Sequence, residues 1–335
     1  MKRFVALVLA LTLCAAPAMA AVYEGQRVRI VIGSTAVSGD SYMVADIVNR
    51  YLQKYLKCSS KVDPVGANAA LATIQTAAPD GLTFMIFHDM TYLGVLFGSY
   101  SKEFALENMV VGPRVGQNPG SCFAGKANAP YANMKEMADW LKANPDKNVR
   151  LSVELGGVSQ IGFIAYYMWV KETYGEDVAN RIRFVVGGST DTKLQQIWDG
   201  NTDVIFADYS SLLQYTASGV EEQLALKFVG MLDKIPGKDG LPVYGDMGIT
   251  LGGKPFYFAK DFLIYLPKGV SDEVVAELDE AVAKMSADPQ FQEDMAKMTY
   301  AGNTLPSKEA KAFIYGKRDA IAAVLAEAPN MEDLE

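Results

Sequence analysis

Three short stretches combine glycine with hydroxyl, amide or carboxylate side chains in a pattern suited to binding a small anion. Each follows a short apolar run and precedes apolar residues at helical spacing, so each lies in a loop that leads into a helix. The free N–H groups in the first turn of a helix favour a bound anion. The candidate ligand-binding residues are therefore Gly39, Asp40, Ser41 and Tyr42, then Gly157, Val158, Ser159 and Gln160, and finally Gly188, Ser189 and Thr190.

Three further candidates, Asn68, His88 and Asp208, each follow another apolar run. In open α/β sheets, ligands bind beyond the carboxyl ends of the strands, so we expect these side chains at the same site. His88 is the only histidine of the chain, and a structural role for it is the alternative interpretation. A tight turn or an ordinary helix cap is likewise the simpler interpretation of each glycine-containing stretch.

Asp40 complicates the hypothesis of a simple anion site. If its carboxylate caps the helix, it occupies the amides that an anion would need and repels the anion by ~1 kcal/mol or more at close range. One hypothesis is that Ser41 is the cap and Asp40 points away. The other is that the ligand carries a donor or a positive charge that Asp40 accepts.

The sequence lacks the motifs of the common catalytic and cofactor sites. Ile161 stands where a G-x-S-x-G motif around Ser159 would need its second glycine. A Ser-His-Asp triad would have to use His88. P-loop, H-E-x-x-H and dinucleotide fingerprints do not occur. We therefore predict a binding protein with no catalytic residues, no cofactor and no metal, and an exported hydrolase is the less favoured alternative.

The predicted elements alternate between strand and helix in two sets. The first set has strands at 28–32, 61–65 and 83–87, and the second has strands at 149–153, 183–186 and 203–206. Helical spacing of apolar residues separates the strands within each set. Two β-α-β-α-β sets favour two mostly parallel sheets with helices on their faces. The glycine-rich break at 116–120 and the run at 226–232 are the predicted crossings between the two halves.

The first twenty residues have the features of a secretory signal peptide. Lys2 and Arg3 precede an apolar run, and Ala18-Met19-Ala20 is a small-residue cleavage site. Cleavage after Ala20 predicts an exported, soluble protein. The remaining chain, about 315 residues, exceeds the size of most single cores, so two domains are expected.

Charge and cysteine content narrow the class further. Without Lys2 and Arg3, the formal net charge of −8 becomes −10, which disfavours nucleic acid and anionic membranes as partners. Two cysteines remain, Cys58 and Cys122. Export permits a disulfide, but they lie far apart in the sequence. Two unpaired thiols are favoured, and pairing stays open as the alternative.

Four motifs occur in the order and spacing of a known family. They are Val28-Arg29-Ile30-Val31 with Gly39-Asp40, Gly66-Ala67-Asn68-Ala69 with Ala78-Pro79-Asp80-Gly81-Leu82-Thr83, Gly187-Gly188-Ser189-Thr190 with Gly200 and Asp203, and Leu266-Pro267-Lys268-Gly269 with Ala287-Asp288-Pro289. Over nearly all residues after 20, the chain resembles the periplasmic solute-binding proteins of tripartite tricarboxylate transporters, the TctC or Bug family. It departs from the family where the first loop keeps one glycine, Gly39, and where Phe206-Ala207-Asp208 replaces Phe-Asp-Asn.

The resemblance implies a two-lobed periplasmic binding protein fold of type II, with a hinge and a ligand cleft. Lobe 1 would comprise residues 21–117 and 232–335, and lobe 2 residues 118–231. A monomer in the periplasm would bind a small organic acid, often a dicarboxylate, largely through backbone amides, hydroxyls and waters. It would deliver this ligand to a large and a small membrane subunit. The same fold would also suit a ligand-sensing adaptor for a membrane signalling receptor.

Overall fold

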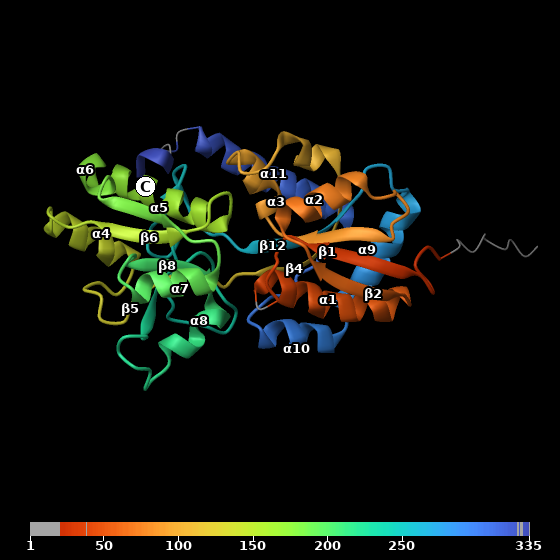
Figure 1. Ribbon diagram of the computed structural model, residues 1–335, viewed down its shortest axis with the longest axis horizontal. Coiled ribbons are helices and arrows are strands. Elements are labelled where there is room, and N and C mark those ends of the chain that lie inside the picture. Colours follow the sequence, from red (N-terminus) through yellow and green to blue (C-terminus); the bar gives the residue numbers. More distant parts are fainter. Residues whose placement is uncertain (1–20, 38, 327, 329–330, 335) are drawn as a thin grey trace, which may run out of the picture.

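Two five-stranded sheets lie side by side, and helices cover both faces of each (Figure 1). This computed structural model describes residues 21–37, 39–326, 328 and 331–334. The predicted signal peptide, residues 1–20, lies outside the described residues. We call the first sheet with its helices the first lobe, and the second sheet with its helices the second lobe. The predicted α/β architecture is confirmed.

The first sheet has the strand order β2 (Ser59–Pro64), β1 (Arg27–Ile32), β3 (Thr83–Phe87), β12 (Lys260–Leu266) and β4 (Val110–Asn118). β1 is parallel to β2 and β3, whereas β12 is antiparallel to its two neighbours. Four of the five strands therefore run in one direction. The helices of this lobe are α1 (Asp40–Leu56), α2 (Ala67–Thr76), α3 (Met90–Leu96), α9 (Asp272–Ser286), α10 (Pro289–Lys297) and α11 (Ser307–Leu325), with short 3-10 turns η1 (Lys102–Phe104) and η2 (Leu106–Asn108).

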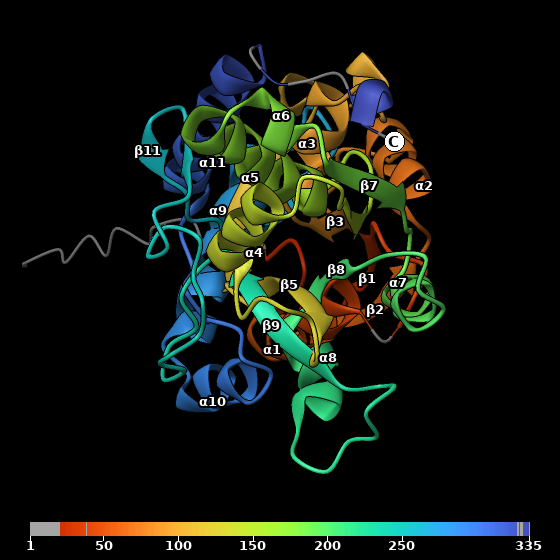
Figure 2. The same cartoon turned by 90° about the vertical axis from the view of Figure 1, so that its left-hand side faces the viewer.

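The second sheet repeats this pattern in the order β7 (Ile182–Val186), β6 (Val149–Val153), β8 (Val204–Asp208), β5 (Ser121–Lys126) and β9 (Leu226–Met231). β5 is the reversed strand here. The helices are α4 (Met134–Ala143), α5 (Val158–Tyr174), α6 (Glu176–Ala179), α7 (Thr190–Trp198) and α8 (Tyr209–Thr216). A view turned by 90° shows α4, α5 and α6 on one side of this sheet and α8 on the other (Figure 2).

The alternation of side chains along β12 explains why helices cover both faces of the first sheet. Phe262 and Ile264 pack in the apolar cluster with α1 and α9, whereas Leu263 and Tyr265 pack in the cluster with α2, α3 and α11. Successive side chains of a strand point to opposite faces. Every residue of β12 is buried, so both faces need a cover. The same burial encloses its two charged residues, Lys260 and Asp261.

The chain passes between the lobes along two extended connections. β4 leads into β5 through Pro119 and Gly120, within the predicted first crossing, and residues 232–259 lead from β9 to β12. The predicted lobe boundaries at 117/118 and 231/232 stay predictions. In the structure, Tyr244 stacks on Phe123 of β5 with ring centroids 5.9 Å apart, so part of the second connection packs on the second sheet. Residues Thr250–Leu251 and Lys254–Pro255 of this connection form a small hairpin, β10 and β11.

The end of the chain returns to the second lobe. After α11, the 3-10 turn η3 (Met331–Leu334) contacts β7, and Leu334 is buried. Figure 1 shows this end beside α5, on the second lobe. No helix among the described residues is both long and apolar enough to cross a membrane. In the same part of the chain, Cys58 and Cys122 are free thiols.

A buried ionic network joins β12 to β4, α11 and the residue before α3. Lys317 Nζ lies 2.6 Å from Asp89 Oδ1 and 2.6 Å from Asp261 Oδ2. The other oxygen of Asp261 accepts hydrogen bonds from Arg114 at 2.9 Å and from Gln117 at 2.7 Å. Because Asp89 and Asp261 are 0% and 1% exposed, their charges depend on these partners.

Replacing Asp261 with alanine should destabilise the protein by about 3–5 kcal/mol, because it leaves Arg114 buried without its carboxylate partner. Urea unfolding at neutral pH measures this loss. The control is Glu176→Ala, which removes the exposed ion pair between Lys171 and Glu176 and should leave the free energy of unfolding nearly unchanged. Equal effects of the two substitutions would contradict a structural role for the network.

Candidate functional site

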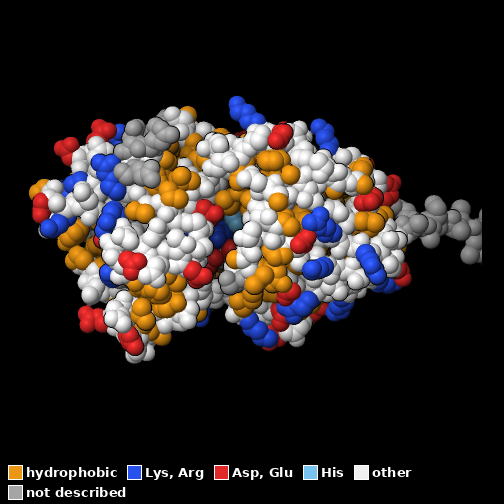
Figure 3. Space-filling model, in the orientation of Figure 1, with side chains coloured by type: hydrophobic (Ala, Val, Ile, Leu, Met, Phe, Trp, Pro, Cys, Tyr) orange, Lys and Arg blue, Asp and Glu red, His pale blue; other side chains and the backbone are white. Residues whose placement is uncertain are grey.

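A hollow between the two lobes brings together side chains from both sheets. Figure 3 shows Lys or Arg, Asp or Glu, and His side chains meeting in it. The described polar and charged groups there come from the carboxyl ends of β3, β6 and β8, from the start of α1, and from β4 and β12. We call β4 and β12 the hinge strands, because each adjoins a connection between the lobes. This is the edge of each sheet at which α/β proteins bind ligands.

Four residues connect the lobes by hydrogen bonds, and we call them the hinge cluster: Asp40, Asn118, Asp208 and Lys260. Lys260 Nζ lies 2.7 Å from Asp40 Oδ2 and 3.2 Å from Asp208 Oδ1. Asn118 Nδ2 donates to the same two oxygens, at 3.0 Å and 2.7 Å. Asn118 and Lys260 are paired in register between β4 and β12. Two donors of the hinge strands therefore hold one carboxylate from each lobe.

The pKa values of the two carboxyl groups in the hinge cluster are shifted in opposite directions. Burial raises the pKa of Asp40, but the charge and hydrogen bond of Lys260 outweigh it and bring the pKa to about 2. Burial and the neighbouring charge of Asp40 raise the pKa of Asp208 above its usual range, in spite of Lys260. Asp40 also accepts a hydrogen bond from the Ser41 amide at 2.8 Å. Asp40 is thus the more firmly ionised of the two.

The structure decides where the Asp40 carboxylate points. The residue before α1 is Gly39, with extended backbone and no side-chain cap. Asp40 is the first helical residue, and its carboxylate reaches an amide of the first turn on one side and Lys260 on the other. The hypothesis that Ser41 caps the helix while Asp40 points away is therefore wrong.

His88 lies beside the hinge cluster and is 7% exposed. Its ring packs against Phe87 and Phe262, with centroids 4.7 Å and 5.3 Å away, and its Nδ1 accepts a hydrogen bond from the Met90 amide at 3.3 Å. Burial lowers the pKa of His88 to about 3, and the charge of Lys260 contributes in the same direction. His88 is therefore neutral at physiological pH, and its Nδ1 is already occupied.

The start of α5 is closely packed against the first lobe. Gly157, Val158, Ser159 and Gln160 are all buried. Ser159 Oγ donates to the Glu154 carbonyl at 3.0 Å, and Gln160 Oε1 accepts from the Gly156 amide at 2.7 Å. These two side chains therefore stabilise their own loop. A Cβ atom on Gly156 would lie 2.5 Å from Ser99 Oγ of the first lobe, so the loop needs glycine for this close approach.

The other predicted residues lie nearer the surface or away from the hinge cluster. Gly188 and Ser189 are exposed, Thr190 and Tyr42 are partly buried, and Asn68 is exposed in the first turn of α2. Ser189 caps α7 by accepting a hydrogen bond from the Thr192 amide at 3.1 Å. Of the predicted residues, Asp40 and Asp208 are therefore brought together through their shared donors Lys260 and Asn118, with His88 close by.

Four charged or polar residues of the hollow were missed by the sequence reasoning: Asn118, Glu154, Lys193 and Lys260. For Lys193 a signal exists, because it falls beside Leu194 and Ile197 on the buried face of α7. A lysine on the apolar side of a helix needs a partner or a function. For Lys260 no comparable local signal exists, since its partners Asp40 and Asp208 come from distant segments, one in each lobe.

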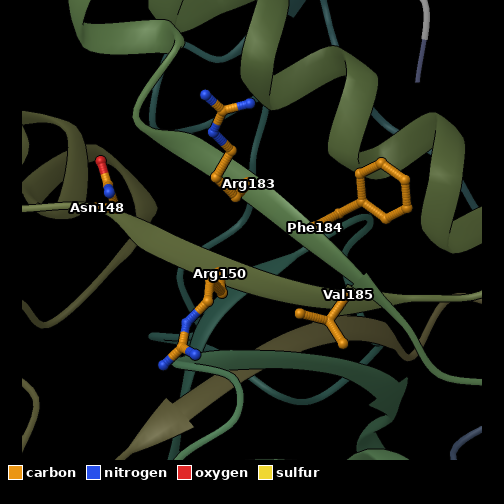
Figure 4. Close-up of a pocket in the computed structure, with 5 residues that line it drawn as sticks. All are labelled: Asn148, Arg150, Arg183, Phe184 and Val185. Carbon is orange, nitrogen blue, oxygen red and sulfur yellow. The ribbon is translucent and has the colours of Figure 1, made fainter. Parts of the chain in front are cut away.

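A separate pocket lies at the opposite end of the second sheet. It has a volume of about 370 Å³ and is lined by Asn148, Arg150, Arg183, Phe184 and Val185 (Figure 4). Arg150 and Arg183 belong to the amino-terminal parts of β6 and β7, away from the ligand-binding edge of a parallel sheet. Arg150 is already engaged by Asp203 and by the Gly200 carbonyl. We therefore take the interlobe hollow as the candidate functional site.

The two lobes and their crossing strands define the fold of the periplasmic binding proteins. No protein-family model and no curated protein sequence matches the chain. Solved structures do match, over nearly the whole chain. BugD has a TM-score of 0.67 and 17% sequence identity, and the match covers 91% of this chain and 98% of BugD. A TctC solute-binding protein from Polaromonas has a TM-score of 0.65 and 14% identity, with 91% of this chain and 99% of that chain covered. MatC from Rhodopseudomonas palustris, with bound malate, has a TM-score of 0.69 and 17% identity, with 89% of this chain and 99% of that chain covered. The chain has the fold of TctC and Bug proteins, which confirms the predicted resemblance at the level of fold.

The neutral state of His88 should make stability depend on pH. The pKa of His88 is about 3 in the folded protein and near 6.5 in the unfolded chain. The neutral side chain therefore contributes fully to the free energy of unfolding above about pH 6.5, and this contribution is lost as the pH falls towards 3. Relative to His88→Gln, the wild type should lose about 2 kcal/mol of unfolding free energy between about pH 7.5 and about pH 5. Urea unfolding of both proteins at the two pH values measures this, and a pH-independent difference would contradict it.

Proposed function

We propose that the protein is a periplasmic solute-binding protein that binds a small organic acid, a carboxylate or dicarboxylate, between its two lobes. The observation that carries the proposal is the interlobe hollow. In it, carboxyl ends of strands from both sheets and the start of α1 converge on buried charged side chains. Open α/β sheets bind small ligands at this edge, and a helix start adds unsatisfied amide donors.

We propose that both lobes contribute residues to the ligand site. Residues 21–117 and 232–335 form lobe 1 and residues 118–231 form lobe 2, with the hinge at β4–β5 and before β12. The contacts of Asp40 and Asp208 with Lys260 connect the lobes at this hinge. The predicted residues at the starts of α1, α5 and α7 line the two sides. Malate, which MatC holds in its structure, is a ligand of the proposed class.

We further propose that the loaded monomer delivers its ligand to the large and small membrane subunits of a tripartite tricarboxylate-type transporter. The sequence motifs and the shared fold support this role. A role without catalysis is supported by the engagement of the two groups that a hydrolase would need. Ser159 Oγ bonds to its own loop, and the accepting nitrogen of His88 faces a backbone amide.

A small carboxylate should raise the melting temperature of the protein, because a ligand that binds only the folded state stabilises it. At about 100 times Kd the gain is about 2.7 kcal/mol, or roughly 5 °C for a chain of this size. A thermal-shift screen of mono- and dicarboxylates on the protein lacking residues 1–20 measures the effect. If no carboxylate stabilises the protein and another class of solute does, the proposed ligand class is wrong.

Gly39→Trp tests whether such a ligand lies in the hollow. Within the described part of the chain, and leaving out the neighbouring residues in the sequence, no atom lies within 4 Å of the position that a Cβ on Gly39 would take. A large side chain can therefore start at this position, directly before Asp40, without a clash at its Cβ. Gly39→Trp should abolish the ligand-induced shift. Gly316→Trp, at an equally open position on α11, is the matched control and should keep the shift.

A further inference from the structure

The charges inside the hollow do not balance. Among the described residues, three carboxyl groups interact there, those of Asp40, Glu154 and Asp208, but only two amino groups, those of Lys193 and Lys260. Burial raises the pKa of Glu154 and of Asp208 and lowers the pKa of Lys193, which reflects the cost of charging these groups in the hollow. His88 adds no charge at neutral pH. A ligand with negative charge alone would increase this imbalance in a buried site, where each unpaired charge is costly.

One amide at the start of α1 is already occupied by the protein's own carboxylate. Asp40 Oδ1 accepts the Ser41 amide at 2.8 Å, and Asp40 Oδ2 accepts Lys260 at 2.7 Å. A ligand carboxylate therefore has neither this amide nor the Lys260 ammonium freely available. The second carboxylate of a dicarboxylate would instead meet Asp40 and Asp208 at close range, where like charges repel.

Lys193 is the buried cation of the hollow that has no polar partner among the described residues. It is 4% exposed, yet no described residue accepts a hydrogen bond from its Nζ or forms an ion pair with it. Its ammonium lies 5.6 Å from the centre of the Phe206 ring, and Lys260 Nζ lies 5.8 Å from the same centre. Its stem packs on Gly187, where a Cβ would lie 2.6 Å from Lys193 Cγ. The stem is thus closely packed, and the ammonium lies over the same ring as Lys260 of the hinge cluster.

Glu154 offers the matching negative charge. It follows β6 and its charge interacts with Lys193, Lys260 and Asp40, but no described residue donates a hydrogen bond to its carboxylate or forms an ion pair with it. It also lies near Tyr100 of the first lobe, since burial and the Glu154 charge raise the pKa of that hydroxyl. The Tyr100 hydroxyl is itself buried and has no hydrogen-bond partner within the described structure.

We propose that the hollow recognises a zwitterionic amino acid or another small amino-carboxylate, whose carboxylate pairs with Lys193 while its ammonium group is accepted by Glu154. This inference rests on the proposed function and narrows its ligand class. Such a ligand places an opposite charge on each of the two unpaired groups and adds no net charge to the hollow. A simple carboxylate satisfies Lys193 but leaves Glu154 without a donor.

Matched pairs of ligands that differ only in –NH₃⁺ and –OH test the inference. Suitable pairs are alanine and lactate, aspartate and malate, and 4-aminobutyrate and 4-hydroxybutyrate, titrated by calorimetry against the protein lacking residues 1–20. The amine member of the pair that fits should bind at least tenfold more tightly. Glu154→Gln, which keeps the side chain's size, should remove that preference.

Lys193→Met keeps much of the packed stem and should lower the affinity for both ligands of the pair at least tenfold. Lys193→Arg, which keeps the positive charge, should restore part of that affinity. Asp199→Asn, at the exposed end of α7, is the matched control for a charge change on that helix. It should leave the affinity for both ligands of the pair unchanged. Far-ultraviolet circular dichroism and urea unfolding establish that each variant is folded.

The outcomes separate this inference from the proposed function. If hydroxy acids or plain carboxylates bind as tightly as the amines, the zwitterion inference is overturned while the carboxylate function stands. If the amine preference persists in Glu154→Gln, or if folded Lys193→Met binds with unchanged affinity, the assigned roles of these residues are overturned. If no member of any pair binds and no other carboxylate does, the proposed function itself fails.

Discussion

The burial of two adjacent charges at the start of β12 is the constraint on which the rest of the structure depends. Lys260 and Asp261 lie in a strand that is covered on both faces, and both are almost fully buried. Successive side chains of a strand point in opposite directions, so the two charges need separate sets of partners. Lys260 forms ion pairs with Asp40 and Asp208, one from each lobe. Asp261 forms ion pairs with Arg114 and Lys317.

These two sets of partners have different consequences. The partners of Asp261 belong to β4 and α11 of the first lobe, so this network stabilises one lobe and the path of its hinge strands. The partners of Lys260 lie on opposite sides of the hollow, so that network connects the lobes. Breaking a buried ion pair costs several kcal/mol. The relative position of the lobes is therefore determined in part by charges that the protein itself supplies.

Much of the fold could be predicted from local patterns. The strand expected at 83–87 is β3, and the break expected at 116–120 contains the turn between β4 and β5. Both signals are local: a short apolar run bounded by turn residues, and glycine with proline at a change of direction. The helix starts that carry the candidate site were also found in this way, because glycine and hydroxyl residues mark them in the sequence.

The composition of the site could be predicted only in part. Asp40 and Asp208 were recognised by their positions at strand ends, but their partner Lys260 lies more than fifty residues further along the chain from either of them. Ion pairs between distant segments depend on which strands become neighbours, and apolar periodicity does not specify this. Lys193 differs, since a helical projection of the sequence by itself places this charge on the apolar face of its helix.

The residues that connect the two lobes differ from the charged residues that we propose select the ligand. Asp40 and Asp208 are joined through Lys260 and Asn118, so contact between the lobes does not require a ligand to bridge them. The two charged groups of the hollow that have no hydrogen-bond or ion-pair partner among the described residues, Glu154 and Lys193, both belong to the second lobe. A ligand that pairs with them, as we propose, gains its charge selectivity from the second lobe. In such a design, exchanging Glu154 or Lys193 changes the charge that a ligand meets and removes no hydrogen bond of the hinge cluster, although both charges interact with Lys260.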